Sequence, residues 1–247
     1  MPRIDIHTHI LPGLDDGPLT LDQSIPMAHT AAQDGTTTIV ATPHSRDMEI
    51  EQSPPEKVNE VADLLNNSLR NDSTEENIPG IKILTGTCNH LTTSLPELIE
   101  SGKANTLNRT RFLLVEPPFG RLPNYMENVL GRLLTQHLVP VLAHPERNIE
   151  FQRKPKRLQQ LVEEGTVVQI ASGSLTGQFG DEAKKTAEQF ILHGMAHVVA
   201  SEMHANKPPR SPILSDSFSV VAKLIGEKSS IDLFETNPKM LLEGRLP

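Results

Sequence analysis

Short β-type runs alternate with longer helical segments along the whole of this chain. The helical segments carry Leu, Val or Ile at steps of three and four residues, which is the period of an amphipathic helix. Such alternation predicts a parallel sheet that is covered by helices. The seven β-type runs are residues 3–7, 37–42, 81–86, 111–116, 138–144, 166–171 and 196–201. The helical segments are residues 55–69, 124–137, 157–165 and 181–194.

The alternation continues without a long low-complexity linker or a detectable repeat. We therefore expect one α/β domain that spans residues 1–247 and resembles a (β/α) barrel. Seven units instead of eight predict an irregular barrel. The polar stretch 66–77 is expected to be a solvated excursion, and the Pro-rich stretch 206–212 to be a loop.

Charge and composition exclude several classes of partner. A formal net charge of −8 argues against binding to a nucleic-acid backbone or an anionic membrane. No apolar run approaches the roughly 18 residues of a membrane span, and no secretory signal is visible, so we expect a cytoplasmic protein without membrane insertion. The single cysteine, Cys88, forms no internal disulfide, which agrees with a reducing compartment.

Chemically able side chains follow the predicted strands at the point where each strand ends. Because the carboxyl ends of parallel strands share one face of a barrel, we expect these side chains to converge on one mouth. Imidazole nitrogens together with carboxylate oxygens suit Mn, Fe or Zn at a catalytic site, whereas a structural zinc site shows paired cysteines. The strand-end residues are His7, His44, Glu116, His144, Glu202 and His204.

The other histidines are treated differently, because a lone histidine is more often hydrogen-bonded or exposed than bound to a metal. Four of them lie inside helical patterns or at turns between helices and strands, and one is left open. The four are His29, His137, His193 and His197, and the open one is His90.

Two further features lie close to the presumed ligands. In the stretch Gly13-Leu-Asp-Asp-Gly17, an aspartate either shapes the turn and caps a helix or places another oxygen over the mouth, and the sequence leaves both readings open for Asp15 and Asp16. Arg147 lies three residues after His144, and Arg210 lies six residues after His204. A planar guanidinium can hold two oxygens of a phosphate ester, so both arginines are candidate phosphate ligands.

Taken together, these stretches resemble a known family. They are HTHILPGLDDG, ATPH, VE, LAHPERN, SEMH and the closing TNPKMLLEG. The chain is similar over nearly its full length to the manganese-dependent protein tyrosine phosphatases of the polymerase-and-histidinol-phosphatase (PHP) fold, of the CpsB/YwqE type associated with capsule and exopolysaccharide synthesis. The combination of HxHILPGxDDG with AHPERN is far more specific than HxH alone.

The resemblance implies a distorted seven-stranded barrel that holds up to three ions, Mn²⁺ by family likeness. It implies attack of metal-activated water on a phosphotyrosine of a protein, such as the tail of a bacterial tyrosine kinase, without a phosphoenzyme. By the same likeness, Arg147 and Arg210 bind the phosphate. The ligands that it implies are His7, His9 and the acid at 202 on one ion, Glu116 and His144 on a second, and Asp16, His44 and His204 on a third.

The chain departs from the family pattern at two positions. Cys88 stands where the family has a glutamate that bridges two metals, and Glu202 stands where it has an aspartate. A thiolate can ligate or bridge Zn or Fe but matches Mn poorly, so Cys88 is either a soft metal ligand or a small buried residue beside a weakened site. The longer arm of Glu202 shifts its carboxylate by about an ångström, which predicts reduced activity.

Other phosphatase and hydrolase chemistries are set aside on their motifs. A cysteine-dependent phosphatase needs an arginine six residues after its nucleophile, and Ser94 stands there. The stretch 171–177 lacks the Gly-x-Ser-x-Gly elbow of a serine hydrolase. Two alternatives stay open: a PHP phosphoesterase acting on a small phosphate ester, and a catalytically weakened homologue that binds phosphotyrosine or a kinase.

Overall fold

The computed structural model describes residues 2–45, 53–71 and 79–247, and parallel strands form its centre. Each of the seven predicted runs contains a strand, and every strand pair is parallel, so the α/β prediction is confirmed. One further strand, β4, has only two residues. The strands are β1 (Arg3–Thr8), β2 (Thr36–Ala41), β3 (Lys82–Thr85), β4 (Asn89–His90), β5 (Phe112–Glu116), β6 (Val139–Ala143), β7 (Val167–Ala171) and β8 (Val198–Ala200).

The strands are divided between two sheets, whereas the sequence predicts one seven-stranded unit. Strands β1, β2 and β3 form one sheet, and β4 to β8 form the other in sequence order. Within the described residues, isolated parallel bridges join the sheets at the two seams, Thr8 with Met203 and His44 with Cys88. Three of the four edge strands are short, since β3 has four residues, β4 two and β8 three, whereas β1 has six. Little strand length is therefore available for pairing across each seam.

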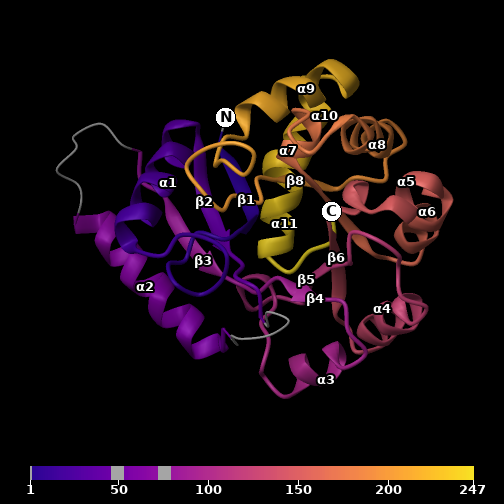
Figure 1. The fold of residues 1–247 in the computed structure, drawn as a ribbon, viewed down its shortest axis with the longest axis horizontal. Coiled ribbons are helices and arrows are strands. Elements are labelled where there is room, and N and C mark those ends of the chain that lie inside the picture. The colour runs from indigo at the N-terminus through magenta and orange to yellow at the C-terminus, as the bar shows by residue number, and fades with distance from the viewer. Residues whose placement is uncertain (1, 46–52, 72–78) are drawn as a thin grey trace.

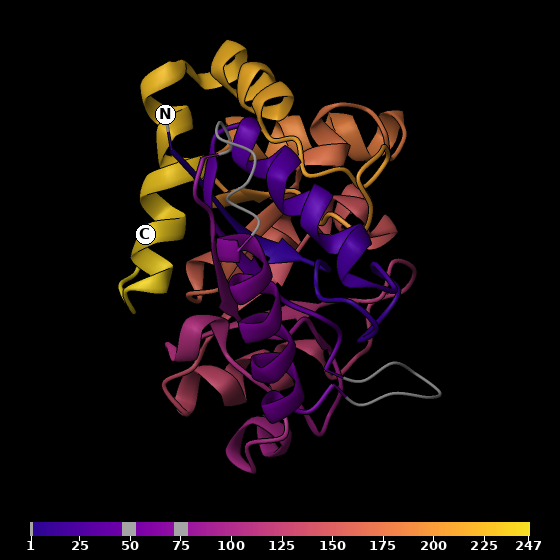
Figure 2. The same cartoon turned by 90° about the vertical axis from the view of Figure 1, so that its left-hand side faces the viewer.

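Helices surround the strands (Figures 1 and 2). The four predicted helices are confirmed as α2, α4, α6 and α8. Within the polar stretch 66–77, which was predicted to be a solvated excursion, residues 66–71 continue α2 and residues 72–77 lie outside the described residues. Residues 206–212 form a loop, as predicted. The helices are α1 (Leu21–Gln33), α2 (Pro55–Asn71), α3 (Leu95–Glu100), α4 (Met126–Thr135), α5 (Ile149–Arg153), α6 (Pro155–Glu163), α7 (Ser172–Leu175), α8 (Asp181–Leu192), α9 (Ser215–Ile225), α10 (Glu227–Ile231) and α11 (Asn237–Leu242).

Buried apolar side chains form a central cluster and two outer ones. The central cluster joins both sheets, because it contains Ile6 of β1, Val40 of β2 and Val141 of β6. Successive side chains of a strand point to opposite faces, and accordingly Leu142 lies in an outer cluster together with side chains of α4 and α6. The other outer cluster packs α1 and α2 against the three-stranded sheet.

Helix α11 covers the amino-terminal ends of the strands. The side chain of Asn237 donates a hydrogen bond to the carbonyl oxygen of His197, which lies just before β8. Asn108, just before β5, donates to the carbonyl oxygen of Leu242, and Leu241 is fully buried in the central cluster. Figure 2 shows α11 at one side of the strands. The carboxyl ends of the strands lie at the other end of the molecule.

Among the helices of the described residues, none combines the length and the apolar character that crossing a membrane requires.

Candidate metal centre

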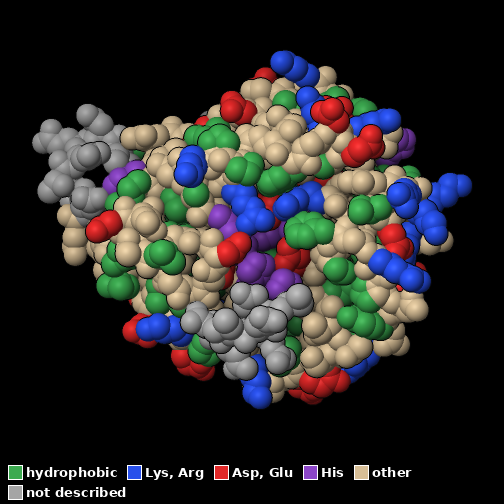
Figure 3. Space-filling view, viewed as in Figure 1, with side chains coloured by type: hydrophobic (Ala, Val, Ile, Leu, Met, Phe, Trp, Pro, Cys, Tyr) green, Lys and Arg blue, Asp and Glu red, His purple; other side chains and the backbone are tan. Residues whose placement is uncertain are grey.

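The predicted metal ligands converge at the carboxyl ends of the strands. Histidine, acidic and basic side chains gather there, at the centre of the face shown in Figure 3. Each of the nine predicted ligands has a nitrogen, oxygen or sulfur atom within 3.9 Å of such an atom on another member of the set. The nine are His7, His9, Asp16, His44, Cys88, Glu116, His144, Glu202 and His204.

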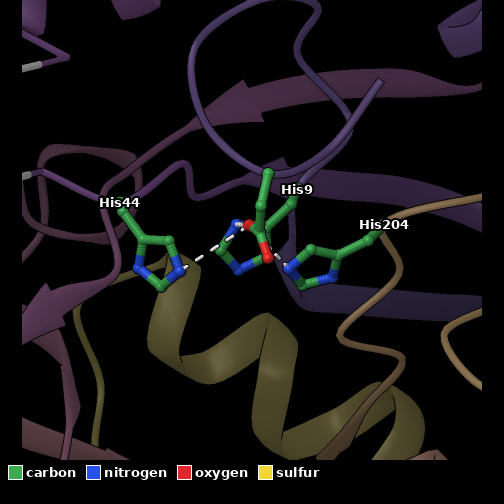
Figure 4. A group of neighbouring side chains, drawn as sticks. His9, His44 and His204 are labelled. Atoms are coloured by element: carbon green, nitrogen blue, oxygen red, sulfur yellow. Dashed lines mark ion pairs between the residues drawn. The ribbon is translucent and has the colours of Figure 1, made fainter. Parts of the chain in front are cut away.

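The first donor group, here called the Asp16 group, contains only nitrogen and oxygen donors. Oδ1 of Asp16 lies 3.1 Å from Nε2 of His204 and 3.9 Å from Nε2 of His44. The imidazole rings of His9 and His204 stack with their centroids 3.9 Å apart. Figure 4 shows the rings of His9, His44 and His204 approaching one another from three different segments. One potential ligand atom from each of the four residues lies within 4.8 Å of the others.

The sequence left open whether Asp15 and Asp16 shape the loop or supply an oxygen ligand, and the structure gives each aspartate a different position. The buried carboxylate of Asp15 accepts hydrogen bonds from the backbone N–H groups of Gly17 and His44, and its other contact is Nδ1 of His9 at 2.6 Å. It therefore shapes the loop and orients an imidazole. The Asp16 side chain is 57% exposed and reaches over the mouth.

The second donor group contains His7, His9 and Cys88. Nδ1 of His9 donates to Asp15, because a carboxylate can only accept, and Nδ1 of His7 lies 2.9 Å from the side-chain oxygen of Gln169. Both Nε2 atoms then carry lone pairs, and they face each other across 3.2 Å. Burial lowers the pKa of His7 to about 4, so its imidazole is neutral near pH 7. Two neutral nitrogens that converge in this way fit a divalent cation.

The third donor group contains His44, Cys88 and Glu116. The two carboxylate oxygens of Glu116 lie 3.2 Å from Nε2 of His144, 3.2 Å from Nδ1 of His90 and 3.7 Å from Nδ1 of His44. Burial works against ionisation, but His144 and His90 hold the pKa of Glu116 well below its usual range. His90, which the sequence left open, thus lies beside this group.

Two of the residues at the mouth adopt a left-handed backbone. His144, directly after β6, has φ 33°, and Glu202, two residues after β8, has φ 54°. This region is uncommon for residues other than glycine, and the cost of adopting it is of order 1–3 kcal/mol. Nε2 of His144 lies 3.8 Å from a carboxylate oxygen of Glu202, so both strained residues contribute to the same site.

Both predicted arginines lie at this mouth. Nη1 of Arg147 donates to the two carboxylate oxygens of Glu202, each at 2.7 Å, and Nη1 of Arg210 lies 3.2 Å from Oδ2 of Asp16. Burial opposes ionisation of Glu202, but His144 and Arg147 lower its pKa to about 2. Glu202 is therefore a carboxylate near pH 7, and it links the arginines to the histidines.

Several residues of the site were not identified in the sequence. Phe119 and Phe179 lie on the Arg147 guanidinium, with their ring centroids 4.5 and 4.0 Å from its central carbon. Glu146 is fully buried and accepts hydrogen bonds from the backbone of Ala171 and the hydroxyl of Ser174. The sequence could have identified Gln169, because it is the single polar side chain within the otherwise apolar strand Val167–Ala171. No sequence pattern could have identified the aromatic contacts, because the two rings lie far from Arg147 in sequence.

Comparison with known proteins assigns the chain to a family. Residues 3–243 match the family model described as capsular polysaccharide synthesis, CpsB/CapC. The tyrosine-protein phosphatase YwqE of Bacillus subtilis is 36% identical over 98% of this chain and 92% of its own length. The tyrosine-protein phosphatase CpsB of Streptococcus pneumoniae is 31% identical over 98% of this chain and 99% of its own.

Solved structures agree with this assignment. A crystal structure from work on YwqE and CpsB, described there as unique metal-dependent tyrosine phosphatases, superposes with a TM-score of 0.91 at 35% identity and covers 98% of this chain and 95% of the other. A β-aspartyl dipeptidase from Fervidobacterium islandicum shares only the fold, with a TM-score of 0.58 at 11% identity over 100% of this chain and 76% of the other. The protein therefore belongs to the CpsB/CapC family of capsular polysaccharide synthesis proteins.

Proposed function

We propose that this protein is a metal-dependent phosphatase that hydrolyses phosphotyrosine on proteins. The observation that carries the proposal is the overlap of three donor groups beside two arginines at a single mouth. The similarity to relatives named tyrosine-protein phosphatases supports the same activity.

The residues of the mouth have distinct roles in this proposal. The donor groups would hold up to three divalent cations, which when bound would activate water for attack on phosphorus and stabilise charge on the phosphoryl oxygens. Arg147 and Arg210 would bind the phosphoryl oxygens through guanidinium N–H groups. Glu202 and Asp16 hold these two arginines at the edge of the donor groups, so phosphate and metals would meet there.

We also infer that residues 1–247 form a single domain of the PHP type, a distorted barrel in which both sheets contribute. The central cluster that joins the two sheets supports this arrangement, as do the parallel bridges at both seams. The shared interior explains how His7 of one sheet reaches Gln169 of the other.

The family likeness implies Mn²⁺, and the nitrogen and oxygen donors of the Asp16 group suit that ion. The same likeness points to the phosphotyrosine tail of a bacterial tyrosine kinase as the substrate. The description of the family as one of capsular polysaccharide synthesis supports a substrate of this kind. A small phosphate ester is the alternative substrate for the same donor groups.

The test is hydrolysis by purified protein. Metal-stripped protein should not hydrolyse p-nitrophenyl phosphate or a phosphotyrosine peptide, and added Mn²⁺, Co²⁺, Zn²⁺ or Fe²⁺ should restore turnover. His144→Ala and Arg147→Ala should each abolish most of it. A preference for aliphatic phosphate esters over the phosphotyrosine peptide would replace the proposed substrate class with the alternative one.

Matched controls separate the mouth from the rest of the surface. Arg132→Ala removes an arginine that is paired with Glu97 on an exposed surface, and His193→Ala removes an exposed histidine at the end of α8. Both should leave turnover unchanged. Circular dichroism of all four variants would show that lost turnover does not reflect lost folding.

One observation favours a second function, that of a binder without turnover. Cys88 is a fully buried thiol 3.9 Å from Glu116, and burial, with Glu116 next, raises its pKa well above the usual value. If no cation binds beside it, the arginines could still bind a phosphotyrosine. Tight binding of the phosphopeptide without turnover under any added metal would support this second function.

A further inference from the structure

Cys88 is held rigidly between the two sheets. Its backbone forms the parallel bridge with His44, in which the N–H of Cys88 donates to the carbonyl oxygen of Pro43 and its carbonyl oxygen accepts from the N–H of Ser45, both at 3.0 Å. Its side chain is fully buried. The two partners, Pro43 and Ser45, flank the predicted metal ligand His44. Their bonds fix the backbone that positions the sulfur.

The sulfur lies within reach of two donor groups at once. It is within 4.8 Å of ligand atoms of His7 and His9, and within the same distance of ligand atoms of His44 and Glu116. Within the described residues, Cys88 alone belongs to both of these groups. A cation in either group would therefore have the same sulfur as a neighbour.

Among the residues that belong to more than one donor group, Cys88 is the best suited to bind two ions. His9 and His44 also belong to two groups each. The Nδ1 of His9 is already engaged by Asp15, however, and a neutral imidazole offers one lone pair to a metal. On metal binding the buried thiol of Cys88 would release its proton to solvent, and the resulting thiolate sulfur carries several lone pairs and can bind two cations.

We propose that the sulfur of Cys88 is a metal ligand shared between two cation sites, one beside His7 and His9 in the second donor group and one beside His44 and Glu116 in the third. The shared sulfur gives both sites a preference for Zn²⁺, Co²⁺ or Fe²⁺ over Mn²⁺. The preference follows from softness, because thiolate selects thiophilic ions whereas carboxylate suits Mn²⁺. The Asp16 group has no sulfur donor and keeps no such preference. This inference rests on the proposed metal-dependent function and specifies the ions of the same site.

The first test uses cobalt as a spectroscopic probe. Metal-stripped protein titrated with Co²⁺ should develop the near-ultraviolet charge-transfer absorption of a cobalt–thiolate bond. Cys88 is the single cysteine of the chain, so no other residue can produce that band. Cys88→Ser should lose the band but keep the visible absorption of cobalt bound to nitrogen and oxygen. Bound cobalt without the band in the unaltered protein, or no bound cobalt, would overturn the proposal.

A second test addresses sharing of the sulfur. Cadmium NMR with a spin-active isotope should give two resonances in the sulfur-ligated range that are coupled to each other. A single sulfur-ligated resonance would show that Cys88 binds one ion and would refute the shared position.

The ion preference is tested by competition between Zn²⁺ and Mn²⁺. Losing an outer-shell partner alone lowers metal affinity by about 10- to 100-fold, so losing a ligand in Cys88→Ser should lower zinc affinity by about 100-fold or more. Manganese affinity should change much less. Equal loss for both ions would contradict the preference, and circular dichroism would identify a folding defect.

Thr42→Ser is the matched control. Thr42 is buried next to the end of β2, and serine keeps the hydroxyl that bonds to the backbone of Thr8. This variant should retain the cobalt–thiolate band and the zinc affinity. A lost band in Thr42→Ser as well would show that the absorption reports general packing, and would count against the proposal.

The readouts keep this inference separate from the proposed function. A cobalt–thiolate band in protein that hydrolyses no phosphotyrosine peptide would support the role of Cys88 and reject the phosphatase. Metal-dependent hydrolysis without the band would support the phosphatase and reject the role of Cys88.

Discussion

At the scale of the residue, the neighbouring aspartates Asp15 and Asp16 have different roles. Asp15 is buried and orients His9, whereas Asp16 is exposed and meets His204 and Arg210. Their separation follows from the turn, because Asp15 accepts the backbone N–H of Gly17 two residues on. A one-residue difference in position therefore decides between a structural carboxylate and a candidate ligand.

Phe119 is expected to hold Arg147 in place for phosphate. An aromatic face within about 6 Å of a guanidinium stabilises it by about 0.5–2 kcal/mol, and this ring is 4.5 Å away and 44% exposed. Phe119→Ala should therefore raise the KM for a phosphotyrosine peptide by roughly 2- to 30-fold, with a smaller effect on kcat. Steady-state kinetics would measure this. Phe119→Tyr keeps the ring, and an equal rise in KM in that variant would contradict the explanation.

His197 should make the stability of the protein depend on pH. Its Nδ1 accepts the backbone N–H of Val168, and burial lowers its pKa below 6.5. As the pH falls below that value, the unfolded chain takes up a proton that the folded chain resists, so stability falls, at most by about 1.4 kcal/mol per pH unit.

The check is urea unfolding between about pH 8 and pH 5. His197→Asn does not titrate in this range and should lose less stability on acidification than the unaltered protein. Above about pH 7.5 the difference between the two proteins should be constant. An identical acid-dependent loss in both would show that other groups cause it.

At the scale of the element, the shape of the loop after β1 determines where two aspartates lie at the site. An added Cβ at Gly17 would lie 2.2 Å from the backbone oxygen of His9, which no real contact allows. The loop that carries Asp15 and Asp16 thus depends on glycine at its end. The site is built from strand ends, but this loop completes it.

Gly17→Ala should displace the two aspartates and lower metal-dependent turnover. A misplacement of about 1 Å can cost about 100-fold in rate, so a loss of that order is expected. Gly80→Ala is the control, because nothing lies within 4 Å of the added atom there. Turnover assays and metal titration of both variants provide the measurement, and equal activity in both would contradict the role given to the loop.

At the scale of the whole molecule, the candidate site joins both sheets. Its donors extend from His7 in the three-stranded sheet to Glu116 in the five-stranded one, with Cys88 at a seam between them. Cations bound there would connect segments that few strand hydrogen bonds connect. Metal binding and global stability should therefore be coupled.

Metal addition should accordingly raise the melting temperature. A cation at about 100 times its Kd adds roughly 2.7 kcal/mol of stability, which for a chain of this size corresponds to about 5–10 °C. Differential scanning calorimetry of stripped and reloaded protein would measure the shift. His144→Ala should show a smaller shift, and no shift in the unaltered protein would contradict the coupling.

Patterns in the amino-acid sequence predicted seven of the strands in the described residues, the helices α2, α4, α6 and α8, and the candidate ligands at the strand ends, but not α1, α9 or the short strand β4. These features depend on local periodicity and on the rule that parallel strands end on one side, both of which can be read within a few residues. The helical stretch at 55–69 and the strand-end histidines are examples.

Other features became visible in the three-dimensional arrangement alone: the division into two sheets, the separate roles of Asp15 and Asp16, the aromatic contacts of Arg147 and the position of Cys88 between two donor groups. Apart from the local turn at Asp15, these features depend on contacts between segments far apart in the chain, as in the pair His7 and Gln169, which are 162 positions apart. Such contacts are set by how strands and helices pack in three dimensions, and local periodicity carries no record of them.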